Sequence, residues 1–212
     1  MIRSEWEYNI NTAILDHFSG PKSIFYSVNS IKPYLGVNLE GEYISIKFLW
    51  SINVSRLSPG KLHLKCDCPL ILLWNLASAQ SLCNGTCLIL LNKTYCVLEV
   101  KILSGQYNGE VAFIPHISLI LSTQPRMTFH LHHCQFPIHL TFALTINKTQ
   151  RQSVWHIDTN PHKPVFLHGQ LYVTLSHATS YKHIKILLLF TITEAHICNI
   201  VYPEIFQMLR SA

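Results

Sequence analysis

The feature that most restricts the fold is a series of short apolar runs across residues 62–134. In runs such as 95–103, apolar and polar side chains alternate with the two-residue period of a strand that buries one face. Asn84-Gly85 and Asn108-Gly109 separate some of these runs and are typical of tight hairpin turns. Strands that follow turns at intervals of roughly 8–12 residues are typical of all-β units. The series therefore predicts a small antiparallel β barrel or sandwich.

The segments on either side of this series have a mixed helix and strand pattern. The expected elements are a helix at 9–18, a strand at 22–28, a helix at 43–52, a strand at 138–146, a helix from about 148, a helix at about 167–175, a strand at 184–191 and a helix at 200–209. The fold class expected for the whole chain is α/β with an inserted small β barrel.

A polar run follows the apolar segment 140–146 without a transition. Ligands bind beyond the strand ends of open α/β sheets, and free N–H groups at a helix start bind phosphate. The side chains in this run that suit a phosphate site are Lys148, Thr149, Gln150 and Gln152. A capped helix start on the surface explains the same residues equally well.

The helix expected at about 167–175 carries apolar residues at helical spacing, Leu171, Leu175 and Ala178. This spacing places Gln170 and His177 near its two ends, where both can reach a site.

The formal net charge of +5 favours an anionic partner only weakly, because the basic residues are scattered along the chain. The apolar run 184–192 is interrupted by Lys185 and is shorter than the roughly 20 residues that span a bilayer. The first residues lack the apolar core of a signal sequence. We therefore expect an intracellular protein that makes no membrane contact and keeps its seven cysteines reduced.

The run His130-Leu131-His132-His133-Cys134 contains candidate metal ligands, and Cys66 and Cys68 are two further candidates. Strand alternation would place His130, His132 and Cys134 on one face, and imidazole with thiolate suits zinc. The chain has no Cys-x-x-Cys pair and no second ligand pair at zinc-site spacing. A structural role for these residues is therefore favoured, and no metal ligand is expected.

Nucleotide-binding glycine motifs are missing from these 212 residues, which contain neither Gly-x-x-x-x-Gly-Lys-[Ser/Thr] nor Gly-x-Gly-x-x-Gly. Both motifs bring backbone N–H groups to phosphates. We therefore do not expect a self-sufficient nucleotide hydrolase.

Four motifs resemble, in the same order, those of the petite-integration-frequency family of superfamily 1 DNA helicases, in particular the Helitron transposon branch. Residues 145–153 resemble Thr-Ile-Asn-Lys-Ser-Gln-Gly-Gln-Ser, and residues 168–179 resemble the end of Ser-His-Gly-Gln-Leu-Tyr-Val-Ala-Leu-Ser-Arg-Val-Thr. Residues 82–88 resemble Leu-Cys-Asn-Gly-Thr-Arg-Leu, and Gln135-Phe136-Pro137 also fits. The similarity runs from about residue 11 to residue 206.

This resemblance implies the C-terminal part of an ATP-dependent DNA helicase. Residues 1–61 and 135–212 would be the two parts of a second RecA-like motor domain, and 62–134 would be an SH3-like β insert. A first motor domain, which binds ATP and Mg in the family, would be the missing partner.

The resemblance also implies roles for single residues. Those expected at single-stranded DNA are Asn147, Lys148, Thr149 and His168. Those expected at the nucleotide are Gln150, Gln152 and Gln170. His177 stands where the family has the arginine that touches the γ-phosphate of ATP.

Departures from the family pattern point to lost activity. Besides His177, residue 151 is arginine where the family has glycine. Other positions at which the branch has arginine are Trp74, Cys87, His116, His132, His133, Cys134 and His139. One transition at a CpG turns arginine codons into codons for these residue types, which would explain five arginines beside 13 histidines.

We therefore expect a degenerate, transposon-derived helicase fragment, nuclear where expressed, that is inactive alone. It should bind single-stranded DNA weakly and should not bind ATP and Mg tightly by itself. Two alternatives stay open, a non-catalytic single-stranded DNA-binding module and a zinc-binding β protein.

Overall fold

The computed structural model describes residues 4–33, 45–52, 57–121, 129–145, 157–159, 168–187 and 199–204. The chain divides into two compact units, one formed by residues 8–143 and the other by residues 1–7 with 144–212. The strands found between residues 62 and 134 all lie in the first of these units. The expected domain boundaries after residues 61 and 134 stay a prediction, because contacts within a fold do not mark the limits of an insertion.

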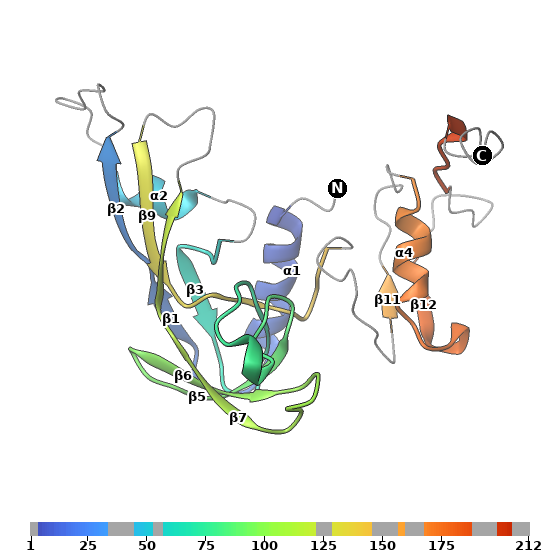
Figure 1. The fold of residues 1–212 in the computed structure, drawn as a ribbon, viewed down its shortest axis with the longest axis horizontal. Coiled ribbons are helices and arrows are strands. Elements are labelled where there is room, and N and C mark those ends of the chain that lie inside the picture. Colours follow the sequence, from blue (N-terminus) through green and yellow to red (C-terminus); the bar gives the residue numbers. More distant parts are fainter. Residues whose placement is uncertain are drawn as a thin grey trace. The chain divides into compact units, whose positions relative to one another are not determined.

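The larger unit is mostly β structure (Figure 1). Its elements are α1 Ser4–His17, which begins before Tyr8, β1 Ser23–Tyr26, β2 Val28–Pro33, α2 Ile46–Ser51, β3 Lys61–Leu64, β4 Pro69–Leu72, a 3-10 turn Ser78–Gln80, β5 Cys87–Lys93, β6 Val97–Ile102, β7 Val111–Pro115, β8 Ile117–Leu121, β9 Phe129–Gln135 and β10 Ile138–Leu140. Gly85 and Gly109, from the two Asn-Gly pairs, have φ of 93° and 94°, which glycine adopts without a Cβ clash.

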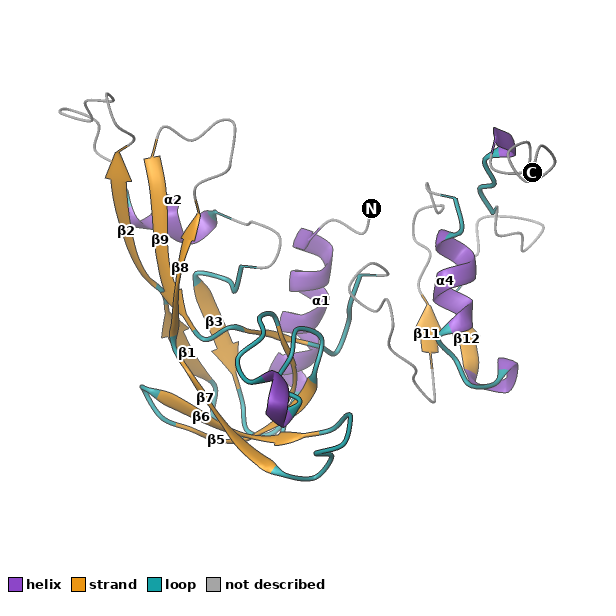
Figure 2. Cartoon of the chain, viewed as in Figure 1, coloured by secondary structure: helices purple, strands orange, loops and turns teal. Residues whose placement is uncertain are grey.

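Antiparallel pairing joins these strands into three sheets (Figure 2). One has the order β10-β4-β5-β6-β7, the second β2-β9-β8, and the third pairs β1 with β3. The chain changes sheets between β1 and β2 at Ser27, between β7 and β8 at His116, and between β9 and β10 at Phe136 and Pro137. The single strand expected at 22–28 is therefore divided at Ser27.

Gln135 and Phe136 hold the point at which these strands change sheets. The Gln135 side chain is 1% exposed, donates from Nε2 to the Phe25 carbonyl oxygen at 3.1 Å, and accepts from the Phe136 N–H at 3.1 Å. The Phe136 ring lies edge-on to Phe25 at 5.3 Å between centroids and stacks on His116 at 3.7 Å. The buried amide thus pairs with backbone groups where strand pairing changes, which avoids the cost of burying them unpaired.

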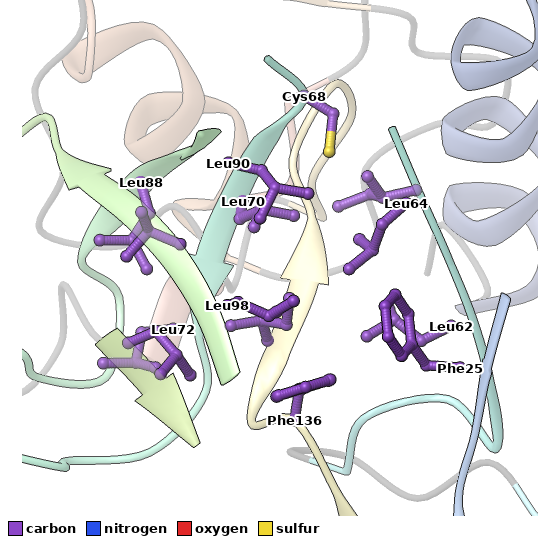
Figure 3. Close-up of a cluster of buried hydrophobic side chains, with 14 of the residues drawn as sticks. Phe25, Leu62, Leu64, Cys68, Leu70, Leu72, Leu88, Leu90, Leu98 and Phe136 are labelled. Atoms are coloured by element: carbon purple, nitrogen blue, oxygen red, sulfur yellow. The ribbon is translucent and has the colours of Figure 1, made fainter. Parts of the chain in front are cut away.

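Leucine side chains fill the space between the five-stranded sheet and the β1–β3 pair, as Figure 3 shows for Leu62, Leu70 and Leu98. Leu15 of α1 belongs to the same cluster and is fully buried. The buried Lys65 side chain donates to the carbonyl oxygens of Asp16 at 3.2 Å and Phe18 at 2.6 Å. It thereby satisfies carbonyl groups that the end of a helix leaves without intrahelical partners.

The expected closed barrel is not what the described residues form. β7 and β10 are the edges of the five-stranded sheet, and the structure gives no pairing between them. In the chain, β8 follows β7 directly and β9 precedes β10 directly. β8 and β9 pair with each other in the three-stranded sheet. The five-stranded sheet therefore does not close between β7 and β10. The chain bends into the three-stranded sheet at His116, after β7, and returns from it at Phe136, before β10. The unit is therefore an open, bent arrangement of sheets.

The strand expected at 138–146 ends at Leu140. Beyond it, the Asn11 side chain of α1 accepts from the Ala143 N–H at 2.9 Å and donates to the Ala143 carbonyl oxygen at 2.8 Å. Asn11 is 1% exposed, so a helix side chain takes the place of a neighbouring strand here. The apolar sequence after Leu140 thus reflects packing rather than strand structure.

The described part of the smaller unit contains β11 Ile157–Thr159, α4 Gln170–Ser176, a 3-10 turn Tyr181–His183 and β12 Ile184–Ile186. β11 and β12 pair in parallel, with α4 between them in the chain, so the three form a β-α-β connection. The helix α4 and the strand β12 agree with the elements expected here, whereas no strand was expected at 157–159. Residues 188–191 of the expected 184–191 strand and 205–209 of the expected 200–209 helix lie outside the described residues.

Within the ranges that the structure describes, no helix combines the length and the apolar character required to cross a bilayer.

Replacing Phe136 with alanine should lower the free energy of unfolding by about 3–5 kcal/mol, because a fully buried ring is lost at the sheet change. Urea unfolding followed by circular dichroism measures the change. Phe113→Ala is the matched control, since that ring on β7 is 63% exposed and should contribute little. Equal losses for the two variants would contradict the central role of Phe136.

Candidate nucleic-acid and nucleotide sites

The polar run expected to contact DNA and nucleotide lies outside the described residues. Asn147, Lys148, Thr149, Gln150 and Gln152 all fall within the undescribed range 146–156, as does Arg151. Their roles, and the helix expected from about 148, stay predictions.

The helix that carries the late motif begins and ends close to the expected positions, at Gln170 and Ser176. Gly169 precedes it with φ 70°, and the Thr174 hydroxyl donates to the Gln170 carbonyl oxygen at 3.0 Å. Gln170 and His177 are half-buried and seven positions apart, so they lie on one side of α4, roughly 10 Å apart along its axis. The structure thus places both residues on one helix face, at its opposite ends.

His168 is tied to the end of the chain. Its Nδ1 accepts from the Tyr202 N–H at 3.0 Å, and its ring lies 5.6 Å from the Tyr202 ring. These two contacts with Tyr202 hold the imidazole in place.

His177 is the C-cap residue of α4. Its Nε2 is buried and makes no hydrogen bond with any part of the chain that the structure describes. A helix C-terminus carries partial negative charge, which disfavours an anion. An enclosed imidazole nitrogen at this end does not fit the role of an arginine that meets the γ-phosphate.

The histidine and cysteine cluster lies on β9, the middle strand of the three-stranded sheet. His130, His132 and Cys134 are half-buried, whereas His133 is buried, so the first three share one face as alternation predicts. Across the described ranges, no group of three histidine, cysteine, aspartate or glutamate side chains is arranged to hold a metal ion. The geometry therefore gives no support to the zinc alternative.

His133 is a packed residue of the fold. It is 2% exposed, and its Nδ1 lies 2.8 Å from Asn29 Oδ1 on β2. Burial lowers the pKa of His133 to about 4, and the backbone of Ser58 offsets a smaller part of this effect. The imidazole is thus neutral at pH 7 and donates to the asparagine from Nδ1.

The Leu-Cys-Asn-Gly-Thr motif forms a turn that supports the core. The Thr86 hydroxyl donates to the Ser81 carbonyl oxygen at 2.7 Å and accepts from the Cys83 N–H at 3.2 Å. The Gly85 N–H donates to the Leu72 carbonyl oxygen at 2.8 Å, and Leu82 is 4% exposed. These contacts explain the motif by structure without a ligand.

One group of side chains, the exposed Tyr26 and Lys61 with the half-buried Trp50, was not predicted from the sequence. The two aromatic rings lie 5.0 Å apart, and the Lys61 ammonium lies within 6 Å of both ring centroids. The members come from three separate segments, β1, α2 and β3. Their spacing along the chain does not predict that they meet. The pairing of β1 with β3 places Tyr26 opposite Lys61.

Comparison with known proteins places part of the chain in a helicase context. Residues 47–92 match the family model described as DNA helicase Pif1, 2B domain. This range contains β3 and β4 and the Leu82–Thr86 turn. A comparison with curated protein sequences gives no match.

Solved Pif1 helicases have a similar fold. The helicase from Candida albicans gives a TM-score of 0.68 at 19% identity and covers 98% of this chain and 48% of that one. Bacteroides Pif1 bound to single-stranded DNA gives 0.67 at 20% identity, covering 96% and 42%. Bacteroides Pif1 in complex with ADP-AlF3 and single-stranded DNA gives 0.65 at 20% identity, covering 96% and 42%. The chain thus spans less than half the length of these structures.

Pif1 is the abbreviation for the petite-integration-frequency helicases. The resemblance to these helicases is confirmed by the family match and the shared fold. The Helitron branch within that family stays a prediction.

Stability should fall as the pH is lowered from about 6.5 to 4, because the folded state binds the His133 proton less readily than the unfolded state. The contribution is complete above pH 6.5 and amounts to about 3 kcal/mol at most. Urea unfolding at several pH values measures it in the wild type and in His133→Gln. The variant should lose part of the pH dependence; identical slopes would contradict the assignment.

Proposed function

We propose that this chain is the C-terminal part of an ATP-dependent DNA helicase related to Pif1. The 2B-domain match at residues 47–92, within a chain whose fold follows solved Pif1 helicases over more than nine-tenths of its length, carries the proposal. In this proposal the β-α-β connection of β11, α4 and β12 belongs to a second RecA-like motor domain. The larger unit contains its SH3-like β insert.

The proposed ligand is single-stranded DNA, which is present in the Bacteroides Pif1 structures. Asn147, Lys148, Thr149 and His168 would contact the strand. Of these, the structure describes His168, whose Nδ1 accepts a hydrogen bond from the Tyr202 N–H. Binding is proposed to be weak, because arginine is scarce and few phosphates would be neutralised.

ATP and Mg would act only with a first motor domain that supplies a phosphate loop. Gln150, Gln152 and Gln170 would line the nucleotide side of this chain. His177 does not fit the γ-phosphate role, since its Nε2 is buried at a helix C-terminus. Arginine would present a fixed and always charged fork there, whereas imidazole is mostly neutral at pH 7. No hydrolytic step is therefore assigned to His177, and the chain is proposed to be inactive as an ATPase.

A non-catalytic DNA-binding module is the second candidate. The group of Tyr26, Trp50 and Lys61 favours it, because this group does not depend on the late helicase motifs.

The chain should show no DNA-stimulated ATPase activity when it is mixed with the first motor domain of a related helicase. Loss of such an arginine typically costs roughly 10³–10⁵ in rate. His177→Arg alone should recover little, because Arg151 occupies a position where the family has glycine. His177→Arg combined with Arg151→Gly should recover much more. Phosphate release measures the rates, and activity of the unmodified chain would contradict the proposal.

Binding to single-stranded DNA should be weak and should have a shallow dependence on salt. Fluorescence anisotropy with a labelled oligonucleotide, repeated over a series of salt concentrations, measures the slope of log K against log salt. Lys148→Gln should reduce the slope by about 0.7, which is one phosphate contact on a single strand. Lys185→Gln on β12 is the matched control and should leave the slope unchanged. A larger effect for Lys185 than for Lys148 would contradict the assignment.

A further inference from the structure

The side chains of Tyr26, Trp50 and Lys61 form a compact group on the larger unit, in which Tyr26 and Lys61 are exposed and Trp50 is half-buried. Tyr26 on β1 lies directly opposite Lys61 on β3 in the antiparallel pair. The Lys61 Nζ is 5.8 Å from the centroid of the Tyr26 ring and 5.4 Å from that of Trp50. The two rings are tilted by 41° at a centroid distance of 5.0 Å. One ammonium group therefore sits beside two aromatic rings.

The position of Trp50 is built into the backbone. Its Nε1–H donates to the Ser27 carbonyl oxygen at 3.1 Å, and the Ser27 N–H donates to the Gly60 carbonyl oxygen at 2.9 Å. A Cβ at residue 60 would lie only 2.7 Å from the Trp50 Cα and 2.8 Å from its carbonyl oxygen. Glycine at this position thus allows α2 to approach β3. The indole ring is ordered before any ligand arrives, which reduces the entropy lost on binding.

The group is open to solvent and to an anion. Tyr26 is 50% exposed although its ring lies beside that of Trp50, and Lys61 is exposed. Within the described ranges Lys61 has no carboxylate partner; the ion pair found there joins Lys22 to Asp16. The net charge of the chain is +5. An exposed ring face beside an unneutralised ammonium is chemically complementary to a base with its adjacent phosphate.

We propose that Tyr26, Trp50 and Lys61 form a binding site for single-stranded DNA, separate from the late helicase motifs. One base stacks on Tyr26, Trp50 supports that ring, and the Lys61 ammonium turns from the rings to the neighbouring phosphate. The proposal rests on the proposed function for the identity of the ligand. It extends DNA binding to the larger unit, where the sequence motifs assigned none.

The test uses the full chain with fluorescein-labelled oligothymidylate and oligouridylate of about 15 nucleotides, the upper range of a single-strand site. Tyr26→Ala should weaken binding of both oligonucleotides by about fivefold or more, the loss expected when one base no longer stacks. Tyr26→Phe should bind like the wild type, because the ring and not the hydroxyl is needed. Lys61→Gln should lower the salt slope by about 0.7.

Two exposed residues elsewhere in the larger unit provide matched controls. Tyr95→Ala removes a tyrosine that is 91% exposed, and Lys101→Gln neutralises an exposed lysine on β6. Both variants should bind like the wild type. Near-ultraviolet circular dichroism checks that every variant is folded. Photocrosslinking of the unmodified chain to an oligonucleotide with 5-iodouracil, followed by peptide mass spectrometry, should identify Tyr26 or Trp50 without any substitution.

The outcomes separate this site from the proposed function. If the chain binds DNA but Tyr26→Ala and Lys61→Gln bind like the wild type and no crosslink reaches these peptides, the site is wrong and the proposed function stands. If the unmodified chain binds no oligonucleotide at low salt, both are wrong. If it binds oligouridylate alone, the assignment to DNA is overturned.

Discussion

The buried amide of Gln135 is the contact on which the larger unit depends. At this point β9 leaves one sheet and the chain enters β10 of another, so the regular exchange of backbone hydrogen bonds is interrupted. The Gln135 side chain bonds the Phe25 carbonyl oxygen and the Phe136 N–H, both of which lie inside the fold. An unpaired buried group would cost about 1–3 kcal/mol each. A single side chain therefore makes the change of sheet energetically possible.

The aromatic contacts of Phe136 turn this local solution into a fixed bend. Its ring meets Phe25 from β1 and His116 from the β7–β8 junction, so the changes of sheet from β1 to β2, from β7 to β8 and from β9 to β10 lie near one cluster. Ser27, at the third change, bonds both Gly60 and the Trp50 side chain. The backbone of Ser27 thus holds the Trp50 side chain of α2 beside Tyr26 and Lys61. The exposed aromatic group is a consequence of how the core is built.

Three histidines of this chain, His116, His133 and His177, have different structural roles. His116 stacks on Phe136, and His133 is buried against Asn29, so both contribute to packing in this chain. The buried Nε2 of His177, in contrast, makes no hydrogen bond with the described residues. The histidines at positions 116 and 133 are therefore explained by packing within the larger unit.

The sequence by itself determined the local elements of this protein. The strand β6 lies inside the run 95–103, glycines 85 and 109 adopt the positive φ that their turns require, and α4 falls near 167–175. Alternation and turn residues act over a few positions, which is why these predictions hold. The resemblance to helicases was likewise carried by contiguous motifs. Only the tertiary structure decided that the sheets stay open at His116 and Phe136, that Asn11 replaces a strand beside Ala143, and that Tyr26, Trp50 and Lys61 meet. Each of these depends on a partner distant in the sequence, and periodicity along a chain contains no information about which distant residue that partner is.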